Sequence, residues 1–269
     1  MTMKSRNVLF CFAVLIWLVS QSCFAQENTV AYEVPRYIVG KNEEVVKHVG
    51  YRFLFSNDFK VSRWVAYQLK SEHVQGKTPP RKTYRNDPKV STVFKSTDFN
   101  SNIFDRGHQA PHKHLAYSPQ TLLEASYFTN ITPQTKELNR GVWKTLETKC
   151  TNWAKKHGTI YITTGSNVKK YDRRLNKKVS IPKLYYKVIL VNNENDKKAI
   201  GYVIPNDTIL SCLCSYAVTV DSVEKLTSLD FFHKLNNDYE EKIEFEIDEK
   251  FWGLCNSNCS KKSKKKSKK

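Results

Sequence analysis

The chain has 269 residues and a formal net charge of +18 at pH 7. It contains no internal repeat and no domain linker, which excludes solenoid and tandem-domain architectures, and its length is enough for one large domain with a substantial core. The charge is not confined to the last nine residues, which hold seven lysines, because residues 26–259 still carry 35 basic and 26 acidic side chains. Such a surface attracts polyanions without reading a sequence, although solubility or adhesion to a membrane surface would also explain it.

The first 25 residues have the pattern of an export signal. Lys4 and Arg6 precede an apolar run over residues 8–20, and small residues follow at the cleavage position. We therefore predict a signal peptide at residues 1–25 and a secreted or periplasmic protein. The run is too short for a membrane span, so no stable membrane association is expected. Cys23 offers an alternative lipid-anchor site, but it lacks the apolar residue that such processing favours before the cysteine.

Residues 26–259 are predicted to form one domain that mixes strands and helices. Short apolar and β-branched segments bounded by turn residues indicate buried and half-buried strands. Asp221-x-x-Glu224 resembles a capping box that opens a short helix. Residues 260–269 are a low-complexity lysine tail that we expect to be disordered. The predicted strands cover residues 51–55, 64–69, 159–164, 185–191 and 199–204, and a second short helix covers residues 236–243.

Residues 71–102 are polar and contain several prolines, which predicts a long loop. The loop carries Arg81, Lys82 and Arg85, whose charges suit contacts with backbone phosphates. A solvated connection without a binding role is the alternative for each of these residues.

The segment from Asp105 to Glu147 concentrates the candidate catalytic residues. His108 ends an Asp-Arg-Gly-His tetrad, and with an ordinary histidine pKa of about 6.5 it can accept a proton at neutral pH. In an extended strand Arg106 lies on the same face and places a permanent cation beside the base. Gly107 between them would let a phosphate backbone approach closely. Hydrolysis of a phosphodiester needs such a base and such a cation.

A helix is predicted after Thr135, which is a candidate N-cap. Asn139 lies near its start, and Glu147, about two turns later, leans back toward it. Gly141 inside the helix suggests that another group approaches closely. Amide and carboxylate oxygens suit Mg²⁺, which needs few protein ligands when phosphate supplies others. The expected core positions in and near this helix are Tyr127, Leu138, Val142, Trp143, Leu146 and Cys150.

The chain resembles the DNA/RNA non-specific endonuclease family of secreted bacterial nucleases, and also mitochondrial endonuclease G, in the motifs DRGHQAP, YFTNITPQ and LNRGVWKTLE. The similarity is most specific over about residues 100–150 and continues more loosely from about 50 to 235. It implies an α+β fold of the ββα-metal (His-Me finger) class, with a central antiparallel sheet flanked by helices. It also implies hydrolysis of single- and double-stranded DNA and RNA with Mg²⁺, for which Mn²⁺ could substitute, leaving 5′-phosphate ends.

The resemblance implies a role for each matching residue. His108 would be the general base, and Arg106 would contact the phosphate or the transition state. Asn139 would bind Mg²⁺ directly. Asn130 and Glu147 would support the site, Glu147 through water on the metal.

The family also has an upstream arginine that binds phosphate. Its best match here is Arg81 in PPRKTYRNDP, but the spacing leaves Lys82 and Arg85 open. Some relatives carry an asparagine four residues before the one that matches Asn130. That position is Ser126 here, so no role is assigned to it.

Several of these residues also have a purely structural explanation. Asp105 is expected to order the local backbone or Arg106 rather than to bind metal. Asn130 and Gln134 could satisfy loop amides, and Glu147 could be an exposed helix charge.

Two other functions compete with the nuclease. A nonenzymatic polyanion-binding protein would need only the basic surface. A zinc hydrolase would use His108, His112 and His114, although their spacing matches no standard zinc pattern.

Five cysteines follow the predicted signal peptide, and an odd number leaves at least one without an intramolecular partner. We predict a disulfide that ties Cys255 or Cys259 to Cys212 or Cys214. A zinc site built from these four thiolates is the alternative, but the C-x-C and C-x₃-C spacings are poor for structural zinc.

Overall fold

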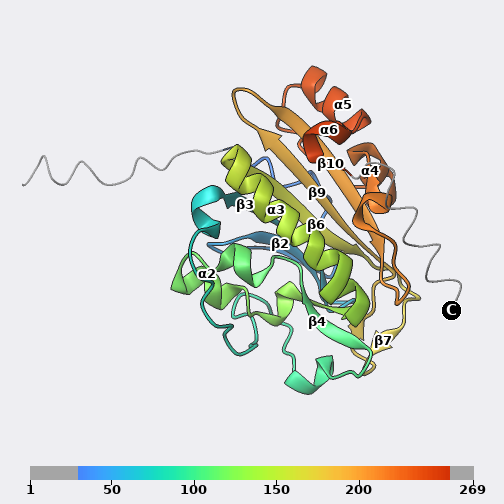
Figure 1. The fold of residues 1–269 in the computed structure, drawn as a ribbon. Coiled ribbons are helices and arrows are strands. Elements are labelled where there is room, and N and C mark those ends of the chain that lie inside the picture. The colour runs from blue at the N-terminus through green and yellow to red at the C-terminus, as the bar shows by residue number, and fades with distance from the viewer. Residues whose placement is uncertain (1–29, 255–269) are drawn as a thin grey trace, which may run out of the picture. The chain divides into compact units, whose positions relative to one another are not determined.

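The fold is built on a seven-stranded sheet in which every neighbouring pair of strands is antiparallel (Figure 1). The computed structural model describes residues 30–254. The predicted signal peptide, the lysine tail, Cys255 and Cys259 lie outside these residues. In sheet order the strands are β1 (Glu43–Lys47), β2 (Arg52–Ser56), β3 (Val61–Lys70), β6 (Thr159–Asn167), β9 (Leu184–Asn192), β10 (Lys197–Pro205) and β11 (Ala217–Val218).

Both faces of this sheet are covered, so its central strands are buried along almost their whole length. In β10, Tyr202 belongs to the same hydrophobic cluster as Cys150 of helix α3 (Trp143–His157). A side chain at the neighbouring Gly201 would instead meet Val223 of helix α4 (Val220–Thr227). Because successive residues of a strand face opposite ways, α3 and α4 cover opposite faces.

A second, two-stranded sheet lies at one end of α3 and precedes it in the chain. It pairs β4 (Phe104–His108) with β5 (Ile131–Thr135), with Arg106 opposite Pro133 and His108 opposite Ile131. The chain then turns directly into the π-helical turn η5 (Leu138–Val142) and α3, which completes a strand–strand–helix unit. The remaining elements are η1 (Ser71–Val74), η2 (Ser96–Phe99), η3 (His112–Leu115), α2 (Pro119–Glu124), η4 (Phe128–Asn130), β7 (Arg174–Leu175), β8 (Val179–Ser180), η6 (Leu213–Tyr216), α5 (Asn237–Phe245) and α6 (Glu249–Trp252).

The predicted strands and the predicted loop at 71–102 are all present, the loop with two short 3₁₀ turns inside it. Thr135 caps the helix as predicted, because its Oγ1 accepts a hydrogen bond from Leu138 N at 3.3 Å. The prediction of a capping box from Asp221 to Glu224 was wrong. Thr219 is the N-cap of α4, and its Oγ1 accepts from Ser222 N at 3.3 Å.

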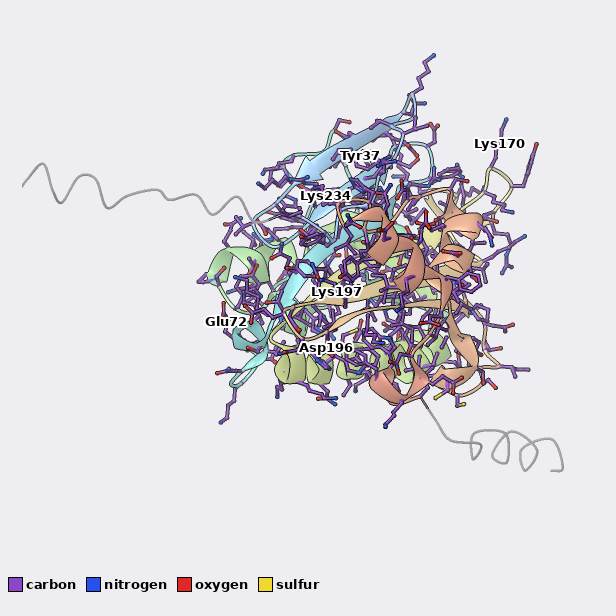
Figure 2. The ribbon with its side chains drawn as sticks, turned by 90° about the horizontal axis from the view of Figure 1, so that it is seen from above. Tyr37, Glu72, Lys170, Asp196, Lys197 and Lys234 are labelled. Atoms are coloured by element: carbon purple, nitrogen blue, oxygen red, sulfur yellow. The ribbon has the colours of Figure 1, made fainter. Side chains whose placement is uncertain are left out.

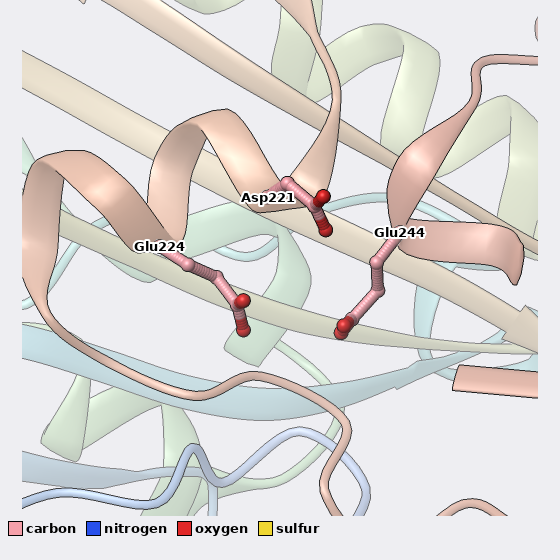
Figure 3. A group of neighbouring side chains, drawn as sticks. All are labelled: Asp221, Glu224 and Glu244. Carbon is pink, nitrogen blue, oxygen red and sulfur yellow. The ribbon is translucent and has the colours of Figure 1, made fainter. Parts of the chain in front are cut away.

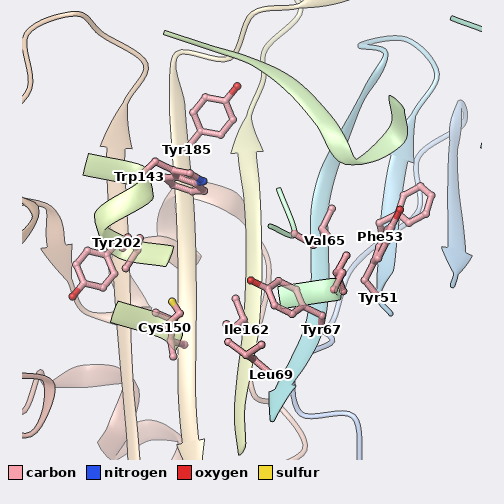
Figure 4. Packing of buried hydrophobic residues seen from close by; sticks show 14 of the residues in the cluster. Tyr51, Phe53, Val65, Tyr67, Leu69, Trp143, Cys150, Ile162, Tyr185 and Tyr202 are labelled. Carbon is pink, nitrogen blue, oxygen red and sulfur yellow. The ribbon is translucent and has the colours of Figure 1, made fainter. Parts of the chain in front are cut away.

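The core between the sheet and α3 holds large aromatic side chains (Figure 4). It also encloses one lysine. Trp143 and Cys150 are buried there, as predicted. Cys150 is a free thiol, and burial raises its pKa to about 12. Lys187 of β9 is fully buried, and its Nζ lies 4.7 Å from the ring centroid of Trp143. Nζ has no hydrogen-bond acceptor within residues 30–254, and the face of the Trp143 ring stabilises its charge.

Basic side chains are spread over the surface, and Lys170 projects from the segment after β6 (Figure 2). Among the residues that the structure describes, no helix combines the length and the apolar character needed to cross a bilayer.

Two glycines should respond oppositely to alanine. A Cβ at Gly165 of β6 would collide with Arg63 O and the Tyr186 ring, so Gly165→Ala is expected to lower the free energy of unfolding by about 2–3 kcal/mol. Gly141 has open space around its Cβ position, which corrects the expected close approach, and Gly141→Ala should raise the free energy of unfolding by about 0.5–1 kcal/mol. Urea unfolding of both variants measures these changes, and equal effects would contradict the packing described here.

Candidate functional site

A cavity of about 780 Å³ opens between β4, the 71–102 loop and the start of α3. It collects five of the seven residues predicted for the site. Asn130 and Arg85 do not line it. The residues that line it are Thr78, Arg81, Tyr84, Asp105, Arg106, His108, Pro111, His112, Lys113, His114, Asn139, Arg140, Lys144, Glu147, Thr148 and Thr151.

His108 ends β4 and is 8% exposed. Burial is the largest cause that lowers the pKa of its imidazole, to about 3, and the charges of Arg81 and His112 lower it further. The ring of Tyr84 lies beside it, with 5.8 Å between the ring centroids. The imidazole is therefore neutral at pH 7 and has a lone pair available for a proton.

Arg106 lies two residues earlier on β4 and lines the same cavity, as the strand period predicted. Its Nη2 donates to Ser96 O at 2.9 Å and to Asn100 Oδ1 at 3.0 Å. Its guanidinium also lies 5.3 Å from the ring centroid of Tyr84. These contacts use one edge of the guanidinium and hold it at the cavity wall.

Asp105 links β4 to the π-helical turn. It accepts two hydrogen bonds from Arg140, each 2.7 Å, and one from Asn139 Nδ2 at 3.0 Å. The Arg140 hydrogen bonds lower the pKa of the Asp105 carboxyl. The expectation that Asp105 orders Arg106 was wrong, because Asp105 holds the arginine of the following helix instead. Its contact with Nδ2 fixes the amide of Asn139 and leaves Oδ1 as the atom able to bind a cation.

The π-helical turn changes how Asn139 and Glu147 are related. In a regular α-helix, eight residues leave the two side chains about 80° apart around the axis. Trp143 N instead donates to Leu138 O, a bond to the fifth residue before it, so the turn absorbs one extra residue. The offset between Asn139 and Glu147 then falls to about 20°, which places both on the cavity side of the helix.

Glu147 is half-buried in the cavity wall. Burial raises the pKa of its carboxyl to about 7, and the charges of Lys187, Arg81 and Lys144 oppose that rise. The carboxyl is therefore poised between its neutral and charged forms near neutral pH.

Asn130 is fully buried behind the site. Its Oδ1 accepts from Ala110 N at 2.9 Å, and its Nδ2 donates to Ala110 O at 2.9 Å and Ala125 O at 3.1 Å. The amide thus clamps the backbone two residues after His108.

The space beside the Cα atom of Gly107 is filled by a side chain of the neighbouring strand, β5. A Cβ at Gly107 would collide with the side chain of Gln134, so the glycine makes room for Gln134 and not for a phosphate, which corrects the expected role. The amide of Gln134 is fully buried, and neither of its polar atoms has a hydrogen-bond partner within the described part of the chain.

The three basic candidates of the 71–102 loop lie in different places. Arg81 lines the cavity, and its charge acts on His108 and Glu147. Lys82 is exposed, and its carbonyl accepts from Ser126 Oγ at 3.3 Å. Arg85 is joined to Tyr127 by a backbone bridge, and its Nε donates to Thr83 O at 3.5 Å.

The histidines do not form a zinc cluster. His114 is a structural histidine: Tyr67 OH donates to its Nδ1 at 3.0 Å, and its Nε2 donates to Thr151 Oγ1 at 3.1 Å. Within residues 30–254, the ligand atoms of His108, His112 and His114 do not come together closely enough to hold one ion.

Four residues in or near the cavity were not predicted from the sequence. Tyr84 and Arg140 form the aromatic and ionic contacts described above, and Lys144 adds a cation to the wall. Lys187 reads as an outward-facing residue in an apolar strand, and only the packing of α3 reveals that it is buried near Glu147. The sequence offered one signal for the Asp105–Arg140 pair: each of these opposite charges is adjacent to a predicted site residue, Arg106 or Asn139.

The comparisons with known proteins agree with this geometry. The sequence pattern of the DNA/RNA non-specific endonuclease family matches residues 31–238. The chain belongs to this family. The fold is accordingly the α+β ββα-metal fold of these nucleases, in which β4, β5 and α3 form the ββα unit.

Members of the family are similar over most of the chain. Nuclease C1 of Cunninghamella echinulata var. echinulata is 29% identical over 216 residues, 73% of this chain and 86% of that protein. A nuclease of Serratia marcescens is 28% identical over 256 residues, 90% of this chain and 94% of that protein. The crystal structure of the EndoG/EndoGI complex contains a chain that matches with a TM-score of 0.68 and 25% identity, covering 75% of this chain and 90% of that one.

The two deeply buried histidines should make stability depend on acid pH. The pKa values of His108 and His114 are about 3 in the folded protein, below the ordinary 6.5, so the unfolded chain binds more protons between these values. The free energy of unfolding should therefore fall as pH drops from about 6.5 toward 3, by about 1.4 kcal/mol per pH unit for each histidine. Urea unfolding from pH 7 to pH 4 should show a shallower slope for His114→Gln. An unchanged slope would mean that His114 is protonated in the native state.

Proposed function

We propose that this protein is an exported, Mg²⁺-dependent endonuclease that hydrolyses phosphodiesters of single- and double-stranded DNA and RNA, with Mn²⁺ able to substitute. The observation that carries the proposal is one cavity lined by a neutral His108, the amide of Asn139, and the guanidinium groups of Arg106 and Arg81. Export is supported by the predicted signal peptide.

The residues present fit a hard divalent ion. Asn139 offers Oδ1, because Nδ2 is engaged by Asp105, and Glu147 lies on the same wall, where it would hold water on the ion. One direct protein oxygen suits Mg²⁺, because this ion keeps several waters and accepts phosphate oxygens. When bound, the ion would neutralise charge on the phosphate and stabilise the departing 3′ oxygen.

His108 would take the proton from the water that attacks phosphorus in line with the leaving oxygen. Its lowered pKa keeps the imidazole unprotonated throughout the neutral range, so the base is always in its active form. Burial beside the ring of Tyr84 restricts the rotation of the imidazole, and Asn130 holds the backbone that follows His108. Asn130 is thus proposed to position the base and not to touch substrate.

Arg106 and Arg81 would bind the scissile phosphate and offset the charge that grows on it. Arg106 is suited to this because Tyr84, Ser96 and Asn100 already fix its orientation, which reduces the entropy lost on binding. Arg81 is favoured over Arg85 as the upstream phosphate contact, since only Arg81 lines the cavity. The basic surface would add attraction for nucleic acid that is independent of sequence.

Cleavage of plasmid DNA and structured RNA, with and without EDTA, tests this proposal against a nonenzymatic polyanion binder. The purified protein should cut both substrates, EDTA should stop cleavage, and Mg²⁺ should restore it. His108→Ala should lower turnover by about 10²–10⁴-fold and leave salt-sensitive DNA binding nearly intact. His73→Ala is the matched control, because that imidazole stacks on Tyr117 outside the cavity. Binding without cleavage in the wild type would leave only the polyanion binder, and restoration by Zn²⁺ alone would indicate a zinc hydrolase.

Asp105→Ala should raise the Mg²⁺ concentration needed for half-maximal cleavage by about 10–100-fold, because it releases Asn139 from its oriented position. Asp196→Ala provides a control, since it removes an acidic partner of His157 at the other end of α3. A Mg²⁺ titration of cleavage rates measures the change. If Asp105→Ala lowered the maximal rate without altering the Mg²⁺ requirement, Asn139 would not be the ligand.

A further inference from the structure

Three carboxylates meet between α4 and α5, on the face of the sheet opposite α3 (Figure 3). Asp221 and Glu224 are three residues apart on one side of α4, and Glu244 comes from the last turn of α5. One oxygen from each lies within 4.8 Å of the others. No step of the proposed nuclease reaction uses them.

Glu244 is the unusual member of this group. It is only 6% exposed, and Figure 3 shows its carboxylate directed toward Glu224. Its Oε1 is buried and has no hydrogen-bond partner anywhere in residues 30–254. A buried carboxylate without a partner is costly, so this atom calls for a bound proton or a bound cation.

One carboxylate oxygen of Glu224 already has a structural hydrogen bond. Its Oε1 accepts from Phe231 N at 2.7 Å, which ties the end of α4 to the segment that follows it. Burial raises the pKa of Glu224 to about 7, with Asp230 and Asp221 adding to the rise. Burial likewise raises the pKa of Glu244 to about 9, and the largest charge contribution comes from Glu224.

The surroundings are acidic in a chain that is otherwise strongly basic. A hollow of about 720 Å³ beside the cluster brings five carboxylates and two lysines together, whereas the whole chain carries +18. This local excess of negative charge is unfavourable without a counterion. The charged residues that line it are Asp221, Glu224, Lys225, Asp238, Glu241, Lys242 and Glu244.

We propose that Asp221, Glu224 and Glu244 bind a divalent cation, Ca²⁺, that joins α4 to α5. Carboxylate oxygens are the ligands that Ca²⁺ prefers, and the open side of the hollow leaves room for the waters that complete its shell. Oxygens on opposite sides of a Ca²⁺ ion are about 4.6–5.2 Å apart, compared with about 4.0–4.2 Å for Mg²⁺. Oxygens that all lie within 4.8 Å of one another can therefore share one Ca²⁺ ion.

The competing explanation is a shared proton. Glu224 and Glu244 could remain together if one of them were protonated, as two carboxyls in one site commonly are. That state would need no metal, and Ca²⁺ would then leave the thermal stability of the protein unchanged.

Thermal unfolding of the full-length chain with and without Ca²⁺ separates the two explanations. Asn139→Ala serves as the background, because it removes the ligand proposed for the catalytic ion. In that background, Ca²⁺ at a hundredfold excess over its Kd should raise Tm by roughly 5–10 °C. Equilibrium dialysis with radioactive Ca²⁺ should show about one ion bound per chain.

Glu244→Gln, added to the same background, should abolish both the rise in Tm and the bound Ca²⁺. This variant keeps the size of the side chain and removes a buried charge, so it should fold. Asp221→Asn should likewise abolish the rise in Tm and the bound Ca²⁺. Glu249→Gln, which alters an exposed carboxylate of α6, should behave like the background. No rise in Tm in the background, or a rise that survives Glu244→Gln, would overturn the proposal. Because Asn139 is altered throughout, neither result depends on whether the protein is a Mg²⁺-dependent nuclease.

Discussion

The carboxylate of Asp105 is the contact on which the candidate site depends. It sits on β4, yet its three hydrogen bonds go to Asn139 and Arg140 in the π-helical turn. The strand that carries His108 and the helix that carries Glu147 are thereby held at a fixed distance. This contact adds to the β4–β5 pairing and to the hydrogen bond between His114 and Thr151 of α3, and it acts directly beside the amide of Asn139.

The π-helical turn and the Asp105 contact serve the same end by different means. The contact sets where Asn139 lies relative to β4, and the extra residue in the turn sets where Asn139 lies around the axis of α3. A π turn is less stable than an α turn, and such turns are found mostly at functional positions. Here the loss of regular helix geometry is balanced by a capped start at Thr135 and by a thoroughly buried stripe that includes Leu138 and Leu146.

Sequence reasoning succeeded where local periodicity decides the outcome. The alternation of a strand was sufficient to place Arg106 and His108 on one face, and the helical repeat was sufficient to identify Leu146 and Cys150 as core. Motif similarity located the strand–strand–helix unit because the relevant residues are contiguous.

Prediction from the sequence failed where the contacting residue belongs to a distant part of the chain. Gly107 was interpreted as room for substrate, but the space belongs to Gln134 of the paired strand, 27 positions later. The π turn could not be predicted because LNRGVWKTLE has the composition of an ordinary helix. Lys187 was missed for a related reason: a single charge in an apolar strand normally faces water, and only the position of Trp143 above it explains its burial.

The buried free thiol of Cys150 has a consequence for its reactivity during folding. Thiol–disulfide exchange requires a thiolate that can reach the sulfur it attacks, and at pH 7 a group with a pKa of about 12 supplies about one thiolate in 10⁵ molecules. Enclosure between α3 and the sheet also keeps reagents in the solvent away from this sulfur, which is fully buried. Once the core has formed, Cys150 is therefore chemically inert, so any reaction of this thiol is confined to the time before it is enclosed.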